Sequence, residues 1–285
     1  MQQRPFGSTQ QQAPVIGQGA YRLEEAARAP AVGALRRGLD LGMTHIDTAE
    51  MYGDGEAEII VGEAIAGRRE DVFLVSKVAP GNATRAGMRD ACEASLRRLG
   101  TDRLDVYLLH WRGEVPLAET VQAFEDLRAA GKILHWGVSN FDVGDLDDLT
   151  KALADLGDPG APVCNQVVYH LGQRAIEHAV APWCEAAGLA VVAYSPFGQG
   201  RFPAPESAGG RALAEVAAAH GATQQQVTLA FLTRRPALFA IPKAASAAHA
   251  AENAGAGDLV LSPDDIARID AAFPIGPRPR TLPII

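Results

Sequence analysis

The chain repeats one pattern along most of its length, an apolar run of strand length followed by a segment with helical periodicity. The runs occupy residues 14–19, 44–49, 72–78, 106–111, 135–140, 164–169, 190–196 and 239–243. Most are nearly continuous in apolar residues, which is typical of parallel strands covered on both faces. The repetition predicts an α/β fold, a (β/α)₈ TIM barrel, with functional groups at the carboxyl ends of its strands.

The segments between and around these runs complete the predicted architecture. Helices are predicted over residues such as 24–41, 84–99 and 116–130. The longer interval between the last two strands contains a loop rich in Gly and Pro and two extra helices, at 208–220 and 223–234. Such a loop at a barrel mouth is a candidate lid. Residues 1–13 predict a hairpin that plugs the barrel bottom, and the proline-rich tail after residue 273 is predicted to lie over the surface. We expect a single domain, residues 1–285.

Composition and motifs exclude several classes of protein. The net charge of −8 argues against a general nucleic-acid or anionic-membrane binder, and no apolar run approaches the roughly 18 residues needed to span a bilayer. The segment Gly17–Gly19 lacks the third glycine of a dinucleotide-binding turn, so a Rossmann domain is not supported. The seven histidines show no metal-ligand spacing, so no metal is predicted.

The remaining features indicate where and in what state the protein works. Its three cysteines form no CxxC pair and are odd in number, which favours a reducing compartment. The N-terminus is polar and unlike a signal segment. We therefore expect a cytoplasmic protein. No apolar helix face demands a partner, so a monomer is expected.

Four polar residues follow consecutive predicted strands. Asp47, Lys77 and His110 end three of the apolar runs, and Tyr52 lies five residues after Asp47 in a turn that contains glycine. The carboxyl ends of parallel barrel strands meet at one mouth. We therefore expect these four side chains to share one pocket.

The four side chains together suit proton donation to a carbonyl group. A free phenol has a pKa of about 10 and is a poor general acid near neutral pH. Lys77 would stabilise the phenolate of Tyr52 and lower that pKa, and Asp47 would hold Lys77 by a charge-assisted hydrogen bond. His110, working as the neutral imidazole, would donate a hydrogen bond to a substrate oxygen.

Each of these residues also has an ordinary structural explanation when taken alone. Tyr52 fits a surface turn, His110 a hydrogen-bonded core position and Asp47 a turn cap. Lys77 at the end of a buried strand is harder to explain, because an unpaired buried ammonium is costly. The arrival of all four at neighbouring strand ends favours catalysis.

These residues lie within motifs that resemble the aldo-keto reductase superfamily. The motifs are Asp47-Thr48-Ala49-Glu50-Met51-Tyr52-Gly53, Ser76-Lys77, Leu108-Leu109-His110-Trp111, Gly137-Val138-Ser139-Asn140-Phe141 and Ile241-Pro242-Lys243, in the family's order and spacing. The resemblance extends from about residue 4 to residue 273. It implies a reductase of small aldehydes or ketones in which Tyr52 is the general acid and a nicotinamide cofactor delivers hydride.

The resemblance also implies where the cofactor binds. Ser139, Asn140 and Gln166 would hold the carboxamide, Tyr194 would stack on the nicotinamide ring, and the loop 198–203 would cover the pyrophosphate. The full implied set is Gly19, Ala20, Tyr21, Asp47, Ser139, Asn140, Gln166, Tyr194, Ser195, Pro196, Phe197, Gly198, Ile241, Pro242, Lys243, His249, Glu252 and Asn253. Taken alone, Tyr194 fits a barrel-filling aromatic equally well.

Departures from the family pattern bear on the choice of cofactor. Lys243 matches the lysine that contacts the 2′-phosphate of NADP, a sensible place for a compact cation. His249 stands where many members carry arginine, and Ala244 where many carry serine or threonine, so phosphate donors are lost. We expect NADPH as the main cofactor, with NADH also used. Glu252 and Asn253 would face the adenine, or would simply form a solvated helix face.

The substrate pocket would be walled by Tyr21, Met51 and Trp111. Family members with bulky substrates often enclose them with long C-terminal loops, whereas only a short tail follows residue 273 here. The resemblance therefore implies small aldehydes or α-dicarbonyl compounds such as methylglyoxal.

Two other functions are compatible with the same residues. Lys77 would form a Schiff base in a barrel lyase, although the adjacent Asp47 would keep it protonated. A non-catalytic subunit that senses NADP(H) is the second alternative, and the complete set of four residues disfavours it.

Overall fold

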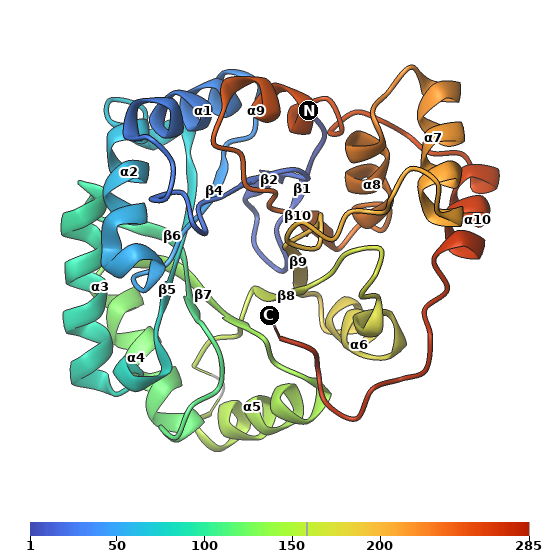
Figure 1. Cartoon of the computed structure of the whole chain (residues 1–285). Coiled ribbons are helices and arrows are strands. Elements are labelled where there is room, and N and C mark those ends of the chain that lie inside the picture. Colours follow the sequence, from blue (N-terminus) through green and yellow to red (C-terminus); the bar gives the residue numbers. More distant parts are fainter. Residues whose placement is uncertain (158, 285) are drawn as a thin grey trace.

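Eight parallel strands form the centre of the molecule. The computed structural model describes residues 1–157 and 159–284. The eight strands follow one another in chain order around the sheet. The strands are β3 (Gln18–Gly19), β4 (His45–Asp47), β5 (Phe73–Val78), β6 (Leu104–Leu109), β7 (Ile133–Ser139), β8 (Cys164–Val168), β9 (Ala190–Tyr194) and β10 (Leu238–Ala240). Figure 1 shows them enclosed by a ring of helices.

The sheet closes on itself where its first and last strands meet. Parallel bridges pair Ile16 with Ala240 and Gly19 with Lys243. The predicted (β/α)₈ barrel is confirmed. The first apolar run is divided, however, because Gln12–Pro14 forms the strand β2 of a separate hairpin, and pairing with the last barrel strand begins at Val15, whose carbonyl accepts from the Ala240 N–H.

Ten helices are described, and most of them cover the outside of the barrel. They are α1 (Arg28–Asp40), α2 (Glu56–Ile65), α3 (Arg85–Leu99), α4 (Leu117–Ala129), α5 (Val143–Asp155), α6 (Val180–Ala186), α7 (Ala208–His220), α8 (Gln224–Leu232), α9 (Ala247–Ala254) and α10 (Pro263–Ala272). The predicted extra helices between the last two strands are α7 and α8. None of the described helices is both long and apolar enough to cross a membrane.

Helix α1 begins at Arg28 and not at residue 24 as predicted. Pro30 explains the difference. A helix starting at residue 24 would place this proline in its interior, where the missing N–H removes a hydrogen bond. Starting at Arg28 puts Pro30 in the first turn, which tolerates proline. Residues 21–27 are consequently left as a loop at the barrel mouth.

The N-terminal hairpin closes the opposite end of the barrel, as predicted. Strand β1 (Gln3–Pro5) pairs antiparallel with β2. Phe6 follows β1 and is fully buried, with its ring 4.8 Å from that of Phe73 and 5.2 Å from that of Phe239. Because Phe73 begins β5, the hairpin packs against the amino ends of the strands and leaves the carboxyl ends open.

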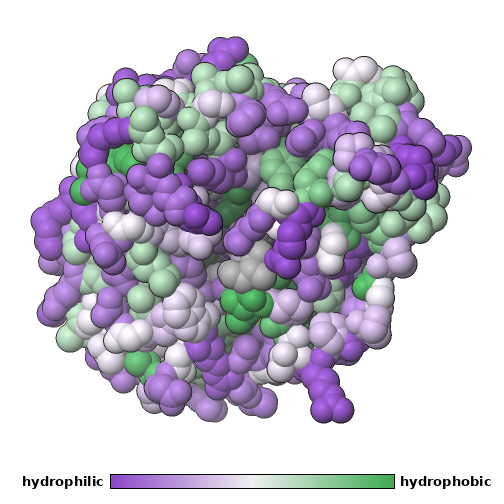
Figure 2. All heavy atoms as spheres, viewed as in Figure 1, coloured by the Kyte–Doolittle hydropathy of each residue, from purple (hydrophilic) through white to green (hydrophobic). Residues whose placement is uncertain are grey.

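The C-terminal tail forms no helix or strand over residues 274–284. Its root is fixed by Arg174, whose guanidinium donates to the Phe273 carbonyl at 2.6 Å, and by His178, which contacts the Gly276 carbonyl at 3.1 Å. The tail then crosses the molecule, so that its last described residues lie near the middle of the view in Figure 1. The same face as spheres shows a hollow near the middle of the view, with apolar surface in its depth and largely polar surface around it (Figure 2).

Candidate active site

The four residues predicted to converge do lie together at the carboxyl ends of the strands. Lys77, the next-to-last residue of β5, donates from Nζ to Asp47 Oδ1 at 2.5 Å, to the Thr48 carbonyl at 2.8 Å and to Tyr52 Oη at 3.2 Å. The rings of Tyr52 and His110 are 5.6 Å apart, centre to centre, in an edge-to-face arrangement. Neighbouring strands thus deliver a carboxylate, an ammonium, a phenol and an imidazole to one place.

The turn after β4 holds Tyr52 in position. Gly53, Asp54 and Gly55 all have positive φ, between 51° and 93°, which glycine adopts without steric cost. Glu50, just before Tyr52, accepts hydrogen bonds from the Ala79 backbone N–H at 2.7 Å and from the Asn82 amide at 3.0 Å. These bonds tie the turn to the loop after β5, a role for Glu50 that sequence reasoning missed.

The charge on Lys77 is stabilised although the side chain is fully buried. Burial alone would lower the pKa of this lysine, but Asp47 and Tyr52 outweigh that effect and raise the pKa above its ordinary value. Its three hydrogen-bond acceptors match the three donors of an ammonium group. Lys77 is therefore a fixed positive charge in contact with the phenol.

Tyr52 differs from the prediction in the direction of its pKa. Burial raises the pKa of the phenol above its ordinary value, and the charge of Lys77 offsets only part of this increase. Tyr52 is thus protonated at neutral pH. Lys77 favours the phenolate that would form if the proton were transferred, as predicted, but it does not lower the pKa below that of a free tyrosine.

His110 is neutral, as predicted. Burial, and to a lesser extent the charge of Lys77, lowers the pKa of His110 to about 3. The imidazole lines the same pocket as Tyr52, and a neutral imidazole has one N–H to donate. The pair therefore presents two neutral donors beside a buried cation, which suits the polarisation and protonation of a carbonyl oxygen.

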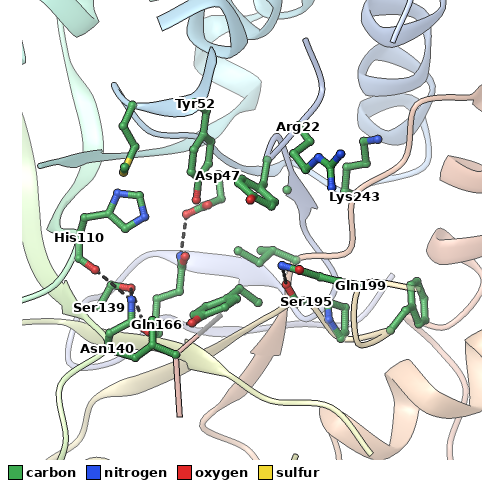
Figure 3. Close-up of a pocket in the computed structure, with 18 of the residues that line it drawn as sticks. Arg22, Asp47, Tyr52, His110, Ser139, Asn140, Gln166, Ser195, Gln199 and Lys243 are labelled. Atoms are coloured by element: carbon green, nitrogen blue, oxygen red, sulfur yellow. Dashed lines mark hydrogen bonds between the residues drawn. The ribbon is translucent and has the colours of Figure 1, made fainter. Parts of the chain in front are cut away.

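A pocket of about 650 Å³ opens above these residues. Most of the predicted site residues line it, and Figure 3 shows His110 toward one end and Lys243 toward the other. The predicted residues in its wall are Gly19, Tyr21, Asp47, Met51, Tyr52, His110, Trp111, Ser139, Asn140, Gln166, Tyr194, Ser195, Pro196, Phe197, Ile241 and Lys243. The predicted substrate wall and the predicted cofactor residues thus meet in one pocket.

Seven of the predicted residues do not line this pocket. Lys77 lies behind Tyr52, and the others are Ala20, Gly198, Pro242, His249, Glu252 and Asn253. Ala20 and Asn253 are buried, whereas His249 is exposed on α9. Their proposed contacts with a cofactor stay predictions.

Five other residues line the pocket, and the site prediction did not include them. They are Arg22, Glu25, Gln199, Gly200 and Ile284. Gln199 and Gly200 belong to the loop that was expected to cover the cofactor. Glu25 was missed because it falls within the predicted helix 24–41, and Ile284 was missed because the tail was predicted to lie over the surface without a defined path.

A chain of hydrogen bonds connects the amide side chains of the pocket to the four residues. Gln166 donates to Asp47 Oδ2 at 2.7 Å (Figure 3), and Asn140 donates to the His110 carbonyl at 3.0 Å. Tyr194 donates from its hydroxyl to Asn140 Oδ1 at 2.9 Å. These bonds orient the amides and place the Tyr194 ring in the pocket wall.

Backbone strain is concentrated around the pocket. The described non-glycine residues with positive φ are Arg22, Asp54, Asn140, Ser195 and Gln199. Four of them line the pocket, and Asp54 belongs to the turn after Tyr52. Such conformations cost on the order of 1–3 kcal/mol each and cluster at functional sites. The pocket is therefore the part of the fold where costly backbone conformations are retained, as is typical of a functional site.

The donor set fits an elongated nicotinamide nucleotide. Amide side chains and an aromatic ring line the middle of the pocket, where an amide-bearing ring could lie, and Lys243 is exposed at one end. No ion pair in the described part of the chain includes Lys243, although its charge contributes to lowering the pKa of Glu25, which follows mainly from the hydrogen bond with Arg22. An available cation at that end suits an anionic group such as a phosphate.

Comparison with known proteins gives concordant results. A model of the aldo/keto reductase family matches residues 15–273. The chain is 48% identical over 265 residues to the methylglyoxal reductase YeaE of Escherichia coli strain K12, covering 92% of this chain and 91% of that protein. It is 32% identical over 272 residues to a glyoxal reductase of Bacillus subtilis strain 168, covering 94% and 93%. A crystal structure of an aldo/keto reductase from Klebsiella pneumoniae in complex with NADP and acetate matches with a TM-score of 0.91 and 46% identity, covering 100% of both chains.

Proposed function

This chain belongs to the aldo/keto reductase family, and we propose that it reduces small aldehydes and α-dicarbonyl compounds, with methylglyoxal as a representative substrate and NADPH as cofactor. The observation that carries the proposal is the hydrogen bond of 3.2 Å between Lys77 Nζ and Tyr52 Oη in the wall of the pocket. It couples a protonated phenol to a buried cation where a carbonyl oxygen would lie.

When bound, NADPH supplies hydride to the carbonyl carbon. The side chains of the chain itself handle the proton. Tyr52, protonated because burial raises its pKa, donates its proton to the carbonyl oxygen. Lys77 stabilises the phenolate left behind, and Asp47 keeps Lys77 charged and in place. His110 donates a hydrogen bond to the same oxygen as a neutral imidazole.

The proposed cofactor residues are those of the pocket wall. Ser139, Asn140 and Gln166 hold the carboxamide, Tyr194 stacks on the nicotinamide ring, and Lys243 binds the 2′-phosphate. The crystal structure from Klebsiella pneumoniae, which contains NADP and covers the whole of this chain at 46% identity, supports this cofactor.

Small substrates are supported by the wall of the pocket near Tyr52. Tyr21, Met51 and Trp111 are 47%, 43% and 37% exposed, respectively, and present large apolar surfaces to the opening. Such a wall excludes water around a short carbonyl compound without offering charged partners to a long one. The similarity to a methylglyoxal reductase and a glyoxal reductase supports α-dicarbonyl substrates.

The test is the oxidation of NADPH by purified protein with methylglyoxal. We expect steady turnover in the wild type, and we expect Tyr52→Phe to lower kcat at least ~10²-fold, the low end for loss of a general acid, while NADPH still binds. Tyr107→Phe is a matched control, because it removes the same atom from a tyrosine that is buried outside the pocket. A Tyr52→Phe enzyme as fast as this control would refute the proposal.

The environment of Lys77 argues against the lyase alternative. A Schiff base requires a neutral amine, whereas this side chain is fully buried, makes three hydrogen bonds and has a raised pKa. Borohydride should therefore trap no substrate on Lys77. A purely sensing role predicts one slow oxidation of bound NADPH without further turnover. The cytoplasmic location and the monomeric state stay predictions.

A further inference from the structure

Two cations lie at the end of the pocket away from His110. Arg22 follows β3 and Lys243 follows β10, and Figure 3 shows them on the same side of the pocket. The two strand ends are joined by the bridge between Gly19 and Lys243 and by a hydrogen bond of 3.1 Å from the Gly19 N–H to the Pro242 carbonyl. The closure of the barrel thus brings the two side chains together.

Glu25 is the anion that accompanies these two cations. Arg22 donates from Nε to Glu25 Oε1 at 2.6 Å, and both side chains are more than half exposed. The hydrogen bond from Arg22 and, more weakly, the charge of Lys243 lower the pKa of Glu25. Glu25 therefore lies in the field of both cations. All three residues line the pocket, and together they carry a net charge of +1.

Few of the phosphate donors that family members provide at this end of the pocket are present in this chain. Ala244 and His249 occupy positions where family members often provide a hydroxyl and a guanidinium. Lys243 alone would face a phosphate that carries close to two negative charges, so a second cation would be expected nearby.

We propose that Arg22 is that second cation and binds the 2′-phosphate of NADPH, and that Glu25 holds Arg22 in place until the phosphate displaces it. The inference rests on the proposed function, because it takes NADPH as the cofactor. A guanidinium can bind two phosphate oxygens at once, which a lysine cannot. The φ of 58° at Arg22 is a strained conformation for a non-glycine residue, and it belongs to the residue that would make this contact.

The displacement of Glu25 from Arg22 by the phosphate predicts how the binding of NADPH and of NADH differs. NADPH must break the ion pair between Arg22 and Glu25 and accept the repulsion of a nearby carboxylate, whereas NADH has only a hydroxyl at this position and leaves the pair intact. Glu25 thus reduces the preference for NADPH. This gives a structural reason why NADH would also be used.

The experiment measures the Kd of NADPH and of NADH by fluorescence titration. For Arg22→Gln we expect the Kd of NADPH to rise about tenfold or more, as for loss of a hydrogen bond to a charged group, and the Kd of NADH to stay within about twofold. For Glu25→Gln we expect the Kd of NADPH to fall several-fold and the Kd of NADH to change little. Asp155→Asn removes the same charge from an exposed residue outside the pocket and should alter neither Kd.

The opposite signs are decisive, because a merely structural ion pair would be weakened by either substitution. If both variants bind NADPH more weakly, or if Arg22→Gln leaves its Kd unchanged, the inference is wrong. An equal rise in the Kd of NADPH and in the Kd of NADH would indicate that Arg22 binds the pyrophosphate, which both cofactors carry, and would also overturn the inference. Thermal melting of each variant separates these outcomes from misfolding. A wild-type protein that binds neither cofactor would refute the proposed function itself.

Discussion

Tyr52 and His110 are the two residues whose protonation should govern the pH dependence of the reaction. In the proposed mechanism, reduction requires the phenol to be protonated and the imidazole to be neutral. Burial raises the pKa of Tyr52 above 10.0 and lowers the pKa of His110 to about 3. Both groups are therefore in their active forms over a wide range around neutrality.

We expect kcat/KM for carbonyl reduction to be flat between about pH 5 and pH 9 and to fall only as Tyr52 ionises at higher pH. An ordinary histidine with a pKa of about 6.5 would instead give an inflection within that range. The measurement is a pH series of initial rates at saturating NADPH. An inflection near pH 6.5 that disappears in His110→Asn, but persists when the exposed His249 is replaced, would contradict the assignment.

Single residues divide into those that sequence could place and those that it could not. Asp47, Lys77 and His110 were placed correctly, because a residue at the end of a buried parallel strand must face the barrel mouth. Glu25 and Arg22 were missed, because their pairing depends on where α1 begins and on the closure of the barrel. The net direction of the pKa of Tyr52 was also not predictable, since it depends on how far the phenol is buried.

Among the elements, the junction between β3 and β10 leaves no room for a side chain at Gly19. A Cβ atom added to Gly19 would lie 2.7 Å from the Ile241 carbonyl oxygen, just after β10. This neighbour is a backbone atom, which cannot rotate away. Glycine is therefore needed here for close approach of two strands.

We expect Gly19→Ala to destabilise the protein by about 1–3 kcal/mol, the usual cost of forcing extra volume into a packed site. It should also weaken NADPH binding, since the displaced strand carries Lys243. Gly33→Ala is the matched control, because Gly33 is exposed on α1 and an added Cβ meets nothing within 4 Å. Thermal melting and NADPH titration measure both effects. Equal melting temperatures for the two variants would show that the junction can relax.

The elements themselves were largely predictable, and their ends were less so. Continuous apolar runs located all eight barrel strands to within a few residues, because burial on both faces leaves that pattern. The start of α1 was set by Pro30, which the apolar periodicity alone did not reveal. The division of the run 14–19 between a hairpin and the barrel depends on tertiary pairing, which no local pattern encodes.

At the scale of the whole molecule, the C-terminal tail links distant parts of the chain to the pocket. It leaves α10, is held at its root by Arg174 and His178, and brings Ile284 into the pocket wall. The sequence predicted an irregular tail but not its path. A proline-rich segment has no hydrophobic period, so its position is decided by contacts with residues about 100 positions away.

We expect deletion of residues 277–285 to raise the KM for methylglyoxal about fivefold, while kcat and the Kd of NADPH change by less than about twofold. Ile284 is 57% exposed, so the contact that it offers a small substrate is worth about 1 kcal/mol, which corresponds to that factor. The deletion keeps Phe273 and Gly276, and with them both anchors of the root, so the barrel itself should melt at nearly the same temperature.

A point variant tests whether the effect of the deletion on KM comes from Ile284 in the pocket wall or from the rest of the tail. Ile284→Ala should raise KM in the same direction as the deletion, since it removes the same apolar surface from the pocket. Val260→Ala, at a residue that is 80% exposed and outside the pocket, should leave KM unchanged. If neither the deletion nor Ile284→Ala alters KM, the tail does not contact the substrate.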